Sequence, residues 1–480
     1  MTCRTLTSNS IYFVIAFGAG CFMACAGSDH GEARSPDSGS SAETGGQGGS
    51  GGGSDGGGGA GNSGGSGAAT GGANSGGKAG STATGGSMNG GNGGAGTGGQ
   101  ANTSFGGMPP NLAGPVSKDC GGISIPKGTG PASGGQVDAW ENVTPQGINL
   151  TQSAFNNDDY GAQDVLVDPV RPSDFYAFFC HQGVYKSTDY GQTWKKVNTG
   201  PGGDRIDAGK PWGEGIDTNR CRDPNTPPVL YSAGSQNGFW RSIDGGVSWQ
   251  TSSFPNDGKA RPQDAYDVDV DPYDGSHLIA GFHEESGLVE STDAGATWSS
   301  VQLDSGIAAG TSYYVFFVDT GSPDTTRKTW LMISQGTGGN AGTWRTADAG
   351  ATWTQVSKNE HNHGDCQLYQ ADGVVYMAGV YASDGWGVYR STDFGVTWTH
   401  YGQGQKQSTM FGTPNHVYAF SAPLGDTTTT ERSDSTGTMW STWSLNLPDG
   451  PKRAAVSYDG THYIIVGGNW NAGVYRYVEP

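Results

Sequence analysis

The segment Ser391-Thr-Asp-Phe-Gly-Val-Thr-Trp398 belongs to a repeat that decides the fold of this 480-residue chain. Four further copies keep its Ser or Thr, Asp, Gly and Trp positions: Ser187 to Trp194, Ser242 to Trp249, Ser291 to Trp298 and Thr346 to Trp353. A sixth copy, Ser433 to Trp440, is degenerate because Ser435 stands in place of the Asp. We call these copies boxes one to six in chain order. Their first residues lie 42 to 55 residues apart, so one supersecondary unit is repeated along the chain.

Each box has the chemistry of a hairpin turn. Its Ser or Thr and Asp side chains can accept hydrogen bonds from backbone N–H groups of the turn, and its Gly suits a position with positive φ. The Trp that ends the box starts the next strand and is large enough to pack against a neighbouring sheet. We therefore expect a structural role for the five box aspartates, which are Asp189, Asp244, Asp293, Asp348 and Asp393.

The box pattern resembles the Asp box, or BNR repeat, of sialidase-like, sortilin-like and xyloglucanase-like β-propellers. The resemblance covers roughly residues 137–480. It implies an all-β fold with four strands in each blade and a box between the third and fourth strands. In those families the box lies on the face away from the active site, in agreement with a structural role for the aspartates.

The strand count predicts a single seven-bladed propeller over residues 137–480. Three strand-like segments precede box one, at 163–168, 175–179 and 183–186, and six boxes give six such blades. Residues 454–458, 463–466 and 473–476 supply three more strands. The fourth strand of this last blade is available at 138–143, so N- and C-terminal strands should close the ring together, which leaves no exposed sheet edge.

The residues before the propeller have the pattern of an export signal and a tether. Ile11 to Met23 is an apolar run that is too short to span a bilayer. Ala24-Cys25 resembles a bacterial lipoprotein lipobox, with Cys25 as the lipid anchor and Cys21 as a weaker alternative. We expect a signal peptide at 1–25, a disordered Gly/Ser/Asn-rich linker at 26–115 and an N-terminal extension at 116–136. Residues 41–107 alone contain 31 glycines.

Charge and cysteine content limit the classes of partner. The formal net charge is −19, which disfavours binding to nucleic acid. We expect membrane contact only through the N-terminal lipid, and a location in the cell envelope or outside the cell. Export would favour up to two disulfides among the four remaining cysteines, with the pairing open. They are Cys120, Cys180, Cys221 and Cys366.

A binding site is expected on one face of the propeller, where the loops that enter the inner strands meet those that join the second and third strands. Acids, amides and aromatics gather in these loops and suit a sugar, which has an apolar face and a polar rim. Arg453 is also one of the residues expected in these loops. The expected substrate-binding residues are His181, Trp212, Arg261, Asp264, His283, His361, His363, Trp386 and Trp470.

Two hydrolase chemistries can be compared with known families. A sialidase is disfavoured because the chain has no Arg-Ile-Pro motif, and its third-strand arginines, Arg241, Arg345, Arg390 and Arg476, suit the scaffold. The residue pattern of the first blade resembles that of xyloglucanases. That family, however, places a catalytic Asp shortly after a Tyr-Ala pair, and Cys180 occupies the corresponding position here. The family also uses a cleft between two propellers, so its mechanism does not transfer.

Another carboxylate pair could still serve a glycoside hydrolase, because inverting enzymes need an acid and a base about 6.5–9.5 Å apart. The preferred catalytic candidates are Asp164, Glu284 and Asp365. The wider set adds Glu214, Asp264 and Asp267.

A third chemistry is a polysaccharide lyase or hydrolase assisted by histidine or a metal. His283, His361 and His363 come from equivalent loops and could bind a divalent ion or transfer protons. No motif in the sequence identifies a cofactor.

A propeller can also bind glycans or proteins without catalysis. Our leading expectation is therefore an exported, lipid-anchored, monomeric propeller that binds a polysaccharide or glycoconjugate. A surface protein is a second possible partner, and a glycoside hydrolase or a lyase is the alternative function.

Overall fold

The computed structural model describes most of the expected propeller. The described residues are 112–113, 134–151, 161–235, 238–255, 265–282, 287–303, 307, 313–334, 341–358, 368–379, 387–401, 409–420, 430–443, 451, 453–469 and 472–480. The chain divides into two units, Met1–Gly93 and Gly94–Pro480, and all described residues lie in the second. Cys25 and the expected signal peptide therefore lie outside the described residues. No helix in the described part is long and apolar enough to cross a membrane.

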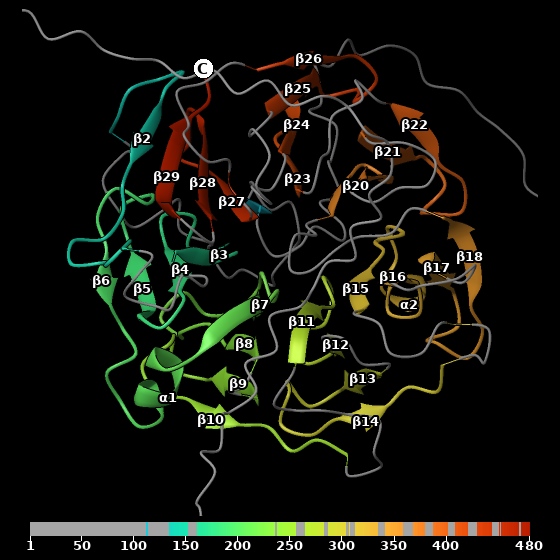
Figure 1. Cartoon of the computed structure of the whole chain (residues 1–480), viewed down its shortest axis with the longest axis horizontal. Helices are drawn as coiled ribbons and strands as arrows, with labels where there is room; N and C mark the ends of the chain where they lie inside the picture. Colours follow the sequence, from blue (N-terminus) through green and yellow to red (C-terminus); the bar gives the residue numbers. More distant parts are fainter. Residues whose placement is uncertain are drawn as a thin grey trace, which may run out of the picture. The chain divides into compact units, whose positions relative to one another are not determined.

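Seven sheets follow one another around a central axis, and their strands are antiparallel except where β1 joins the last sheet (Figure 1). Six sheets contain four strands in chain order from the inside outward. The seventh combines strands from both ends of the propeller, in the order β1-β27-β28-β29-β2. The predicted all-β, seven-bladed architecture is confirmed.

The blades are numbered in chain order, and their strands are given from the innermost outward. Blade one has β3 (Ala162–Val167), β4 (Phe175–Phe179), β5 (Gly183–Ser187) and β6 (Lys195–Lys196), and blade two has β7 (Lys210–Ile216), β8 (Leu230–Ser235), β9 (Gly238–Ser242) and β10 (Gln250–Thr251). Blade three has β11 (Ala265–Val270), β12 (Leu278–Phe282), β13 (Leu288–Ser291) and β14 (Ser299–Ser300), and blade four has β15 (Tyr313–Phe317), β16 (Trp330–Ser334), β17 (Gly342–Thr346) and β18 (Thr354–Ser357).

The remaining blades continue this order. Blade five has β19 (Tyr369–Ala371), β20 (Val374–Gly379), β21 (Gly387–Ser391) and β22 (Thr399–Tyr401), and blade six has β23 (Thr409–Gly412), β24 (His416–Phe420), β25 (Thr430–Asp434) and β26 (Trp440–Thr442). Blade seven has β27 (Arg453–Tyr458), β28 (Tyr463–Asn469), β29 (Ala472–Val478) and β2 (Trp140–Asn142), and β1 (Leu112–Ala113) lies beside β27. Two short helices, α1 (Gly203–Asp207) and α2 (Pro323–Thr326), lie in connections.

The core lies between neighbouring blades. Second strands are covered on both faces, so a sequence such as that of β4 is continuously apolar instead of alternating, whereas the innermost strands also carry buried acids. In blade one, all five residues of β4 are buried, whereas the outer strand β6 is short and partly exposed. The large aromatic residues expected from the composition fill the spaces between sheets: Phe239, for example, packs edge-on against Trp298 of the next blade, with ring centres 4.7 Å apart.

The box turns have the hydrogen bonds expected of them. In box one, Asp189 accepts hydrogen bonds from Thr193 N at 2.9 Å and from Ser187 Oγ at 2.7 Å. Ser187 Oγ in turn accepts one from Gly191 N at 2.9 Å, and Gly191 has a φ of 79°. Hydrogen-bonded side chains therefore fix each turn from within.

Arginines on third strands tie each of three blades to the box turn of the next blade. Arg241 donates to Ala294 O at 3.1 Å and Arg345 donates to Phe394 O at 2.8 Å. Arg476 of blade seven closes the ring by donating to Tyr190 O of box one at 2.8 Å. These contacts are part of the scaffold.

Blade seven joins the two ends of the propeller as predicted. β2 pairs antiparallel with β29, and Trp140 lies opposite Tyr477. The indole of Trp140 also packs on Phe420 and Trp443 of blade six. On the inner side, β1 pairs parallel with β27, which places residues 112–113 against the strand nearest the centre (Figure 1).

The two faces of the ring carry different connections. Because strands within a blade are antiparallel, the links between blades and those between second and third strands lie on one face, which we call the mouth face. The links between first and second strands and the box turns lie on the other, which we call the box face.

Polar contacts join neighbouring blades near the box face. At six junctions they measure 2.5 to 3.0 Å: Arg222 to Asp168 (blades two and one), Thr218 Oγ1 to Asp271 O (two and three), Tyr273 OH to Asp319 (three and four), Gln370 Nε2 to Phe317 O (five and four), Ser457 Oγ to Pro172 O (seven and one), and several donors to Glu479 (six and seven). The junction of blades five and six differs and is described below.

Candidate functional site

Three consecutive blades begin their inner strands with the same irregularity. The pairing register shifts between Ala162 and Asp164 in blade one, and at the corresponding places in β7 and β11. Such a bulge inserts one extra residue and redirects the side chains beside it. Asp164 and Asp267 directly follow the shift in their blades, and Glu214 comes one position later in β7. The sequence therefore places three carboxylates near the mouth-face ends of adjacent strands.

Arg453 connects these acids across the centre of the ring. It is the first residue of β27 in blade seven. Its Nη1 lies 3.4 Å from Asp164 Oδ2 of blade one, and its Nη2 lies 3.2 Å from Asp267 Oδ1 of blade three. We call Asp164, Glu214, Asp267 and Arg453 the channel cluster.

Further hydrogen bonds fix the orientation of the three carboxylates. Val165 N donates to Asp164 Oδ1 at 2.7 Å, and Val315 N of blade four donates to Asp267 Oδ2 at 3.3 Å. Ser232 Oγ donates to Glu214 Oε1 at 2.9 Å. All four residues of the cluster are buried, with Asp164 and Asp267 only 1% exposed.

Burial and neighbouring charges shift the pKa of two members of the cluster, Asp267 and Arg453. Burial raises the pKa of Asp267, and the charge of Arg453 offsets only part of this effect. Burial lowers the pKa of Arg453, but Asp164 and Asp267 outweigh it, so the guanidinium keeps its proton. Burial also raises the pKa of neighbouring Asp269 well above its usual value, although Phe317 N donates to it at 2.7 Å. The site thus combines a cation with carboxyls that tend to retain protons, an arrangement suited to acid–base chemistry.

A row of aromatic rings flanks the channel cluster. Trp212, expected to bind substrate, is half-buried with its ring centre 5.4 Å from that of Tyr266. Tyr266 continues the row to Tyr314 at 5.3 Å. The rings come from blades two, three and four and belong to one apolar cluster, so Trp212 packs within the wall of the channel.

The first-blade loop that carries Cys180 lies beside helix α1. Cys180 is a buried thiol, whereas Cys221 is disulfide-bonded to a cysteine outside the described residues. One disulfide at Cys221 is compatible with the expectation of up to two among the four cysteines, and the buried thiol of Cys180 means that Cys180 does not contribute to one. Next to Cys180, His181 is partly exposed, with its Nδ1 3.1 Å from Ala208 O. The contact with a main-chain carbonyl fixes the ring at the edge of this loop.

The remaining predicted site residues fall on other parts of the chain. Outside the described residues lie Arg261, Asp264, His283, Glu284, His361, His363, Asp365, Trp386 and Trp470. The proposed metal ligands are all in this group. Within the described part of the chain, no three His, Cys, Asp or Glu residues lie close enough to hold a metal ion.

Sequence reasoning identified the individual members of the channel cluster but not their contacts. Asp269 was missed, although Tyr266-Asp-Val-Asp-Val-Asp271 shows acids at alternate positions, which places them on one side of a strand. The pairing of blade seven with blade three has no signal in the sequence.

Comparisons with known proteins agree with this fold. No protein-family model matches the chain. A xyloglucanase of Hypocrea jecorina is 27% identical over 307 residues, which are 55% of this chain and 34% of the relative. A xyloglucanase of Paenibacillus is 28% identical over 308 residues, or 54% of this chain and 28% of the relative. The chain thus spans about a third of the length of these curated relatives.

A solved structure supports the same fold. The GH74 xyloglucanase of Xanthomonas campestris superposes with a TM-score of 0.50 at 18% identity, covering 70% of this chain and 53% of that one. The chain is therefore a seven-bladed β-propeller. Its sequence is similar to part of the xyloglucanases.

Proposed function

We propose that the chain is a polysaccharide-active glycoside hydrolase in which the channel cluster supplies the carboxylate pair. The observation that carries the proposal is that one guanidinium, Arg453, spans Asp164 and Asp267. A single guanidinium keeps its two partners within about 10 Å of each other, close to the separation of glycosidase carboxylates. The sequence similarity to xyloglucanases supports a β-glucan substrate.

We infer a role for each member of the pair. Asp267 tends to keep its proton and would donate it to the leaving glycosidic oxygen. Asp164 is the other carboxyl held by Arg453, and we assign it as the base that takes a proton from the attacking water. Water then adds to the anomeric carbon as the glycosidic bond breaks, with one proton donated and one accepted. The position held by an acid in the related enzymes is Cys180 here, so this pair replaces the family's own.

A specific observation favours a second function, polysaccharide binding without cleavage. Both carboxylates are only 1% exposed, so contact with a glycan requires access that the described residues do not provide. In this case Arg453 and its acids would hold the inner strands together, and recognition would rest on the loops of the mouth face.

The test uses the full chain with xyloglucan and other β-glucans, and measures new reducing ends and polysaccharide binding. We expect release of reducing ends, and a loss of at least about 100-fold in kcat for Asp164→Asn and Asp267→Asn. Asp319→Asn, which alters a buried acid at the box face, is the matched control and should keep its activity. Binding without release by the unmodified chain would establish the second function. Equal rates for Asp267→Asn and the unmodified chain would refute the catalytic pair.

The N-terminal pattern adds a proposal about location. We propose that residues 1–25 direct export, that Cys25 carries the lipid, and that residues 26–115 tether a monomeric propeller at the cell envelope. Export is compatible with the disulfide of Cys221. Metabolic labelling with a radioactive fatty acid should mark the chain, and Cys25→Ser should abolish the label. Labelling that persists in this variant and disappears in Cys21→Ser would move the anchor to Cys21.

A further inference from the structure

At the junction of blades five and six, the polar contacts found between described residues are longer than those at the other junctions. Among the described residues, two tyrosines of blade five make its polar contacts. Tyr369 OH donates to Thr413 O at 3.5 Å, and Tyr376 OH donates to Thr436 O at 3.3 Å. Both distances are longer than a typical hydrogen bond between a hydroxyl and an oxygen. The two blades are therefore held mainly by apolar packing.

The arginine link between blades also differs here. Arg390 occupies the third-strand position from which Arg241, Arg345 and Arg476 reach the next box turn. Its buried Nε has no acceptor among the described residues. Its guanidinium lies instead over the ring of Tyr376, 5.8 Å from the centre.

The cause is the degenerate sixth box. Ser435 replaces the box aspartate, and neighbouring Asp434 accepts the turn's hydrogen bond from Thr436 N at 3.0 Å. Ser435 itself is exposed. Tyr376 OH donates to the carbonyl of Thr436. In three other blades, the carbonyl at this position of the next box accepts a hydrogen bond from an arginine.

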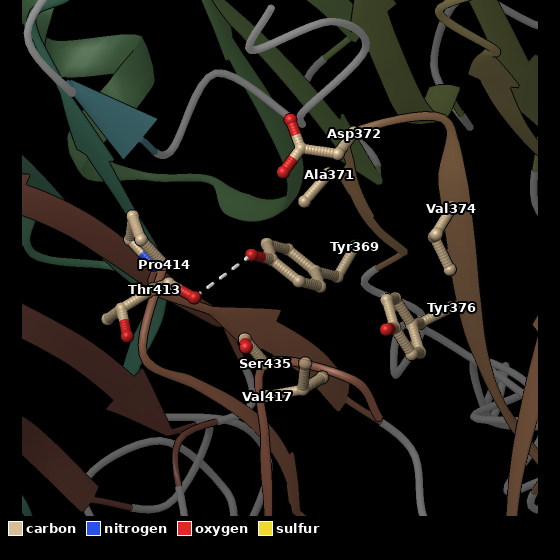
Figure 2. Close-up of a pocket in the computed structure, with 9 residues that line it drawn as sticks. All are labelled: Tyr369, Ala371, Asp372, Val374, Tyr376, Thr413, Pro414, Val417 and Ser435. Carbon is tan, nitrogen blue, oxygen red and sulfur yellow. Dashed lines mark hydrogen bonds between the residues drawn. The ribbon is translucent and has the colours of Figure 1, made fainter. Parts of the chain in front are cut away.

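A pocket of about 210 Å³ opens at this junction on the box face (Figure 2). It lies beside the turn between β19 and β20, which has only two residues, Asp372 and Gly373. The corresponding connections of blades one to four are longer. A short turn and a degenerate box together leave the space unfilled.

The lining combines apolar surfaces with hydrogen-bond acceptors. Tyr369 and Tyr376 stack with ring centres 5.6 Å apart, and Val374 and Pro414 extend the apolar surface. Both tyrosine hydroxyls donate to main-chain carbonyls, so their oxygens act as acceptors, and that of Tyr376 is shared with the side chain of Arg390. Asp372 stands at the rim, and Figure 2 shows its carboxylate on the side opposite Ser435.

This lining selects a ligand rich in donors with an apolar side. A cation would satisfy the acceptors, but the guanidinium of Arg390 already lies over Tyr376 and would repel it. A neutral sugar ring offers hydroxyl donors at its edge and C–H groups on its face, which suit the carboxylate and the aromatic rings. The volume is below the roughly 300 Å³ of pockets for larger ligands, so it suits one ring.

We propose that this pocket binds a single neutral pyranose unit of a polysaccharide. The inference rests on the proposed function, since it gives the propeller a second contact with the same class of ligand. The site lies on the face opposite the channel mouth. It would hold a branch or chain end while the mouth face acts on another part of the polymer.

The test is titration of the full chain with xyloglucan heptasaccharide and with glucose, followed by NMR or calorimetry. Ser435→Trp, which fills the pocket from an exposed position, should weaken binding of the heptasaccharide at least tenfold. Asp372→Asn, which keeps the shape and removes the charge, should weaken it several-fold. Ala351→Trp, an exposed aromatic on the box face of blade four, is the matched control and should bind as the unmodified chain does.

The outcomes separate this inference from the proposed function. Asp267→Asn should lose hydrolysis and keep pocket binding, whereas Ser435→Trp should lose pocket binding and keep hydrolysis of short soluble substrates. Unchanged heptasaccharide binding in both Ser435→Trp and Asp372→Asn would overturn the sugar pocket whether or not the chain is an enzyme. Binding of Nα-acetyl-lysine methylamide in preference to both sugars would overturn the choice of a neutral ligand.

Discussion

The two junctions on either side of blade six differ in the kind of contact that holds them. Between blades six and seven, the buried carboxylate of Glu479 accepts four hydrogen bonds of 2.6 to 2.9 Å, from Thr413 Oγ1, Asn415 Nδ2, His416 Nδ1 and Tyr418 OH. Between blades five and six, the described polar contacts are two tyrosine hydroxyls at 3.3 and 3.5 Å. One junction is a polar network and the other is mainly aromatic.

The difference shows where hydrogen bonds between blades are needed to close the ring. Blade seven is assembled from strands that are far apart in the chain, β2 and β27 to β29, so closing it orders a very long loop at a cost in chain entropy. Glu479 directly follows β29 and fixes the joined blade to its neighbour. Blades five and six are consecutive in the chain and do not need such a contact, which leaves their junction able to vary and to hold a pocket.

Loss of the Glu479 network should have the largest effect on stability. Glu479→Ala leaves four donors near blade six without their acceptor, and we expect a loss of about 3–5 kcal/mol. Glu479→Gln retains one carbonyl acceptor and should lose less. Denaturant unfolding followed by tryptophan fluorescence measures both. A loss below about 1 kcal/mol for Glu479→Ala would show that the polar network is not what closes the ring.

The dependence of stability on pH tests a charged contact, that of His277, because aromatic contacts do not titrate in this range. Burial opposes protonation of His277, but hydrogen bonds to Asp271 and Glu290 raise its pKa to about 9. Because the folded pKa exceeds the unfolded value of about 6.5, the stabilisation is complete below about pH 6.5. It is lost as the pH rises towards 9, by up to about 3 kcal/mol.

The matched variant for this titration is His277→Gln, which should be less stable at pH 6 and should show a flatter profile between pH 6.5 and 9. Thermal unfolding across this range measures the effect. The unmodified chain keeping its full stability at pH 9.5 would show that His277 is not held as the cation.

The box turns provide a smaller, local comparison. Asp393 accepts hydrogen bonds from Thr397 N at 2.8 Å and Thr397 Oγ1 at 2.6 Å, so Asp393→Ser should cost about 1–2 kcal/mol. The reverse change in box six, Ser435→Asp, should gain less than about 0.5 kcal/mol. The reason is that Met439 stands where other boxes have the donating Thr or Ser. Thermal unfolding of both variants tests the pair, and a gain of 1 kcal/mol or more in box six would contradict it.

The sequence predicted those features that depend on local chemistry. The Ser, Asp and Gly of each box specify a turn without help from distant residues. The strand at 138–143 could be assigned to blade seven because the last three strands of the chain lacked a fourth. The channel cluster is different. Asp164 and Arg453 were expected on the same face, but their contact depends on the curvature of the ring and on the bulge in β3, which no local pattern shows.

The pocket was missed for a related reason. Ser435 was recognised as a departure from the repeat, but its consequence depends on the two-residue turn at Asp372 in the preceding blade. A pattern search examines each repeat alone, whereas the cavity is a property of two adjacent repeats. Degenerate positions in a repeat protein are therefore best examined together with the neighbouring blade.

The smallest expected effect tests the weak junction directly. Tyr369→Phe removes a hydroxyl whose hydrogen bond to Thr413 O measures 3.5 Å, while the stack of its ring on Tyr376 is kept. A long hydrogen bond lies at the lower end of the usual range, so we expect a loss of about 0.5 kcal/mol. Unfolding of this variant beside Glu479→Ala measures the contrast between the two junctions. Equal losses would mean that the Tyr369 hydroxyl closes its junction as firmly as Glu479 closes the next. The pocket would then have to be regarded as part of a tightly bound interface, and its walls could not adjust to a sugar.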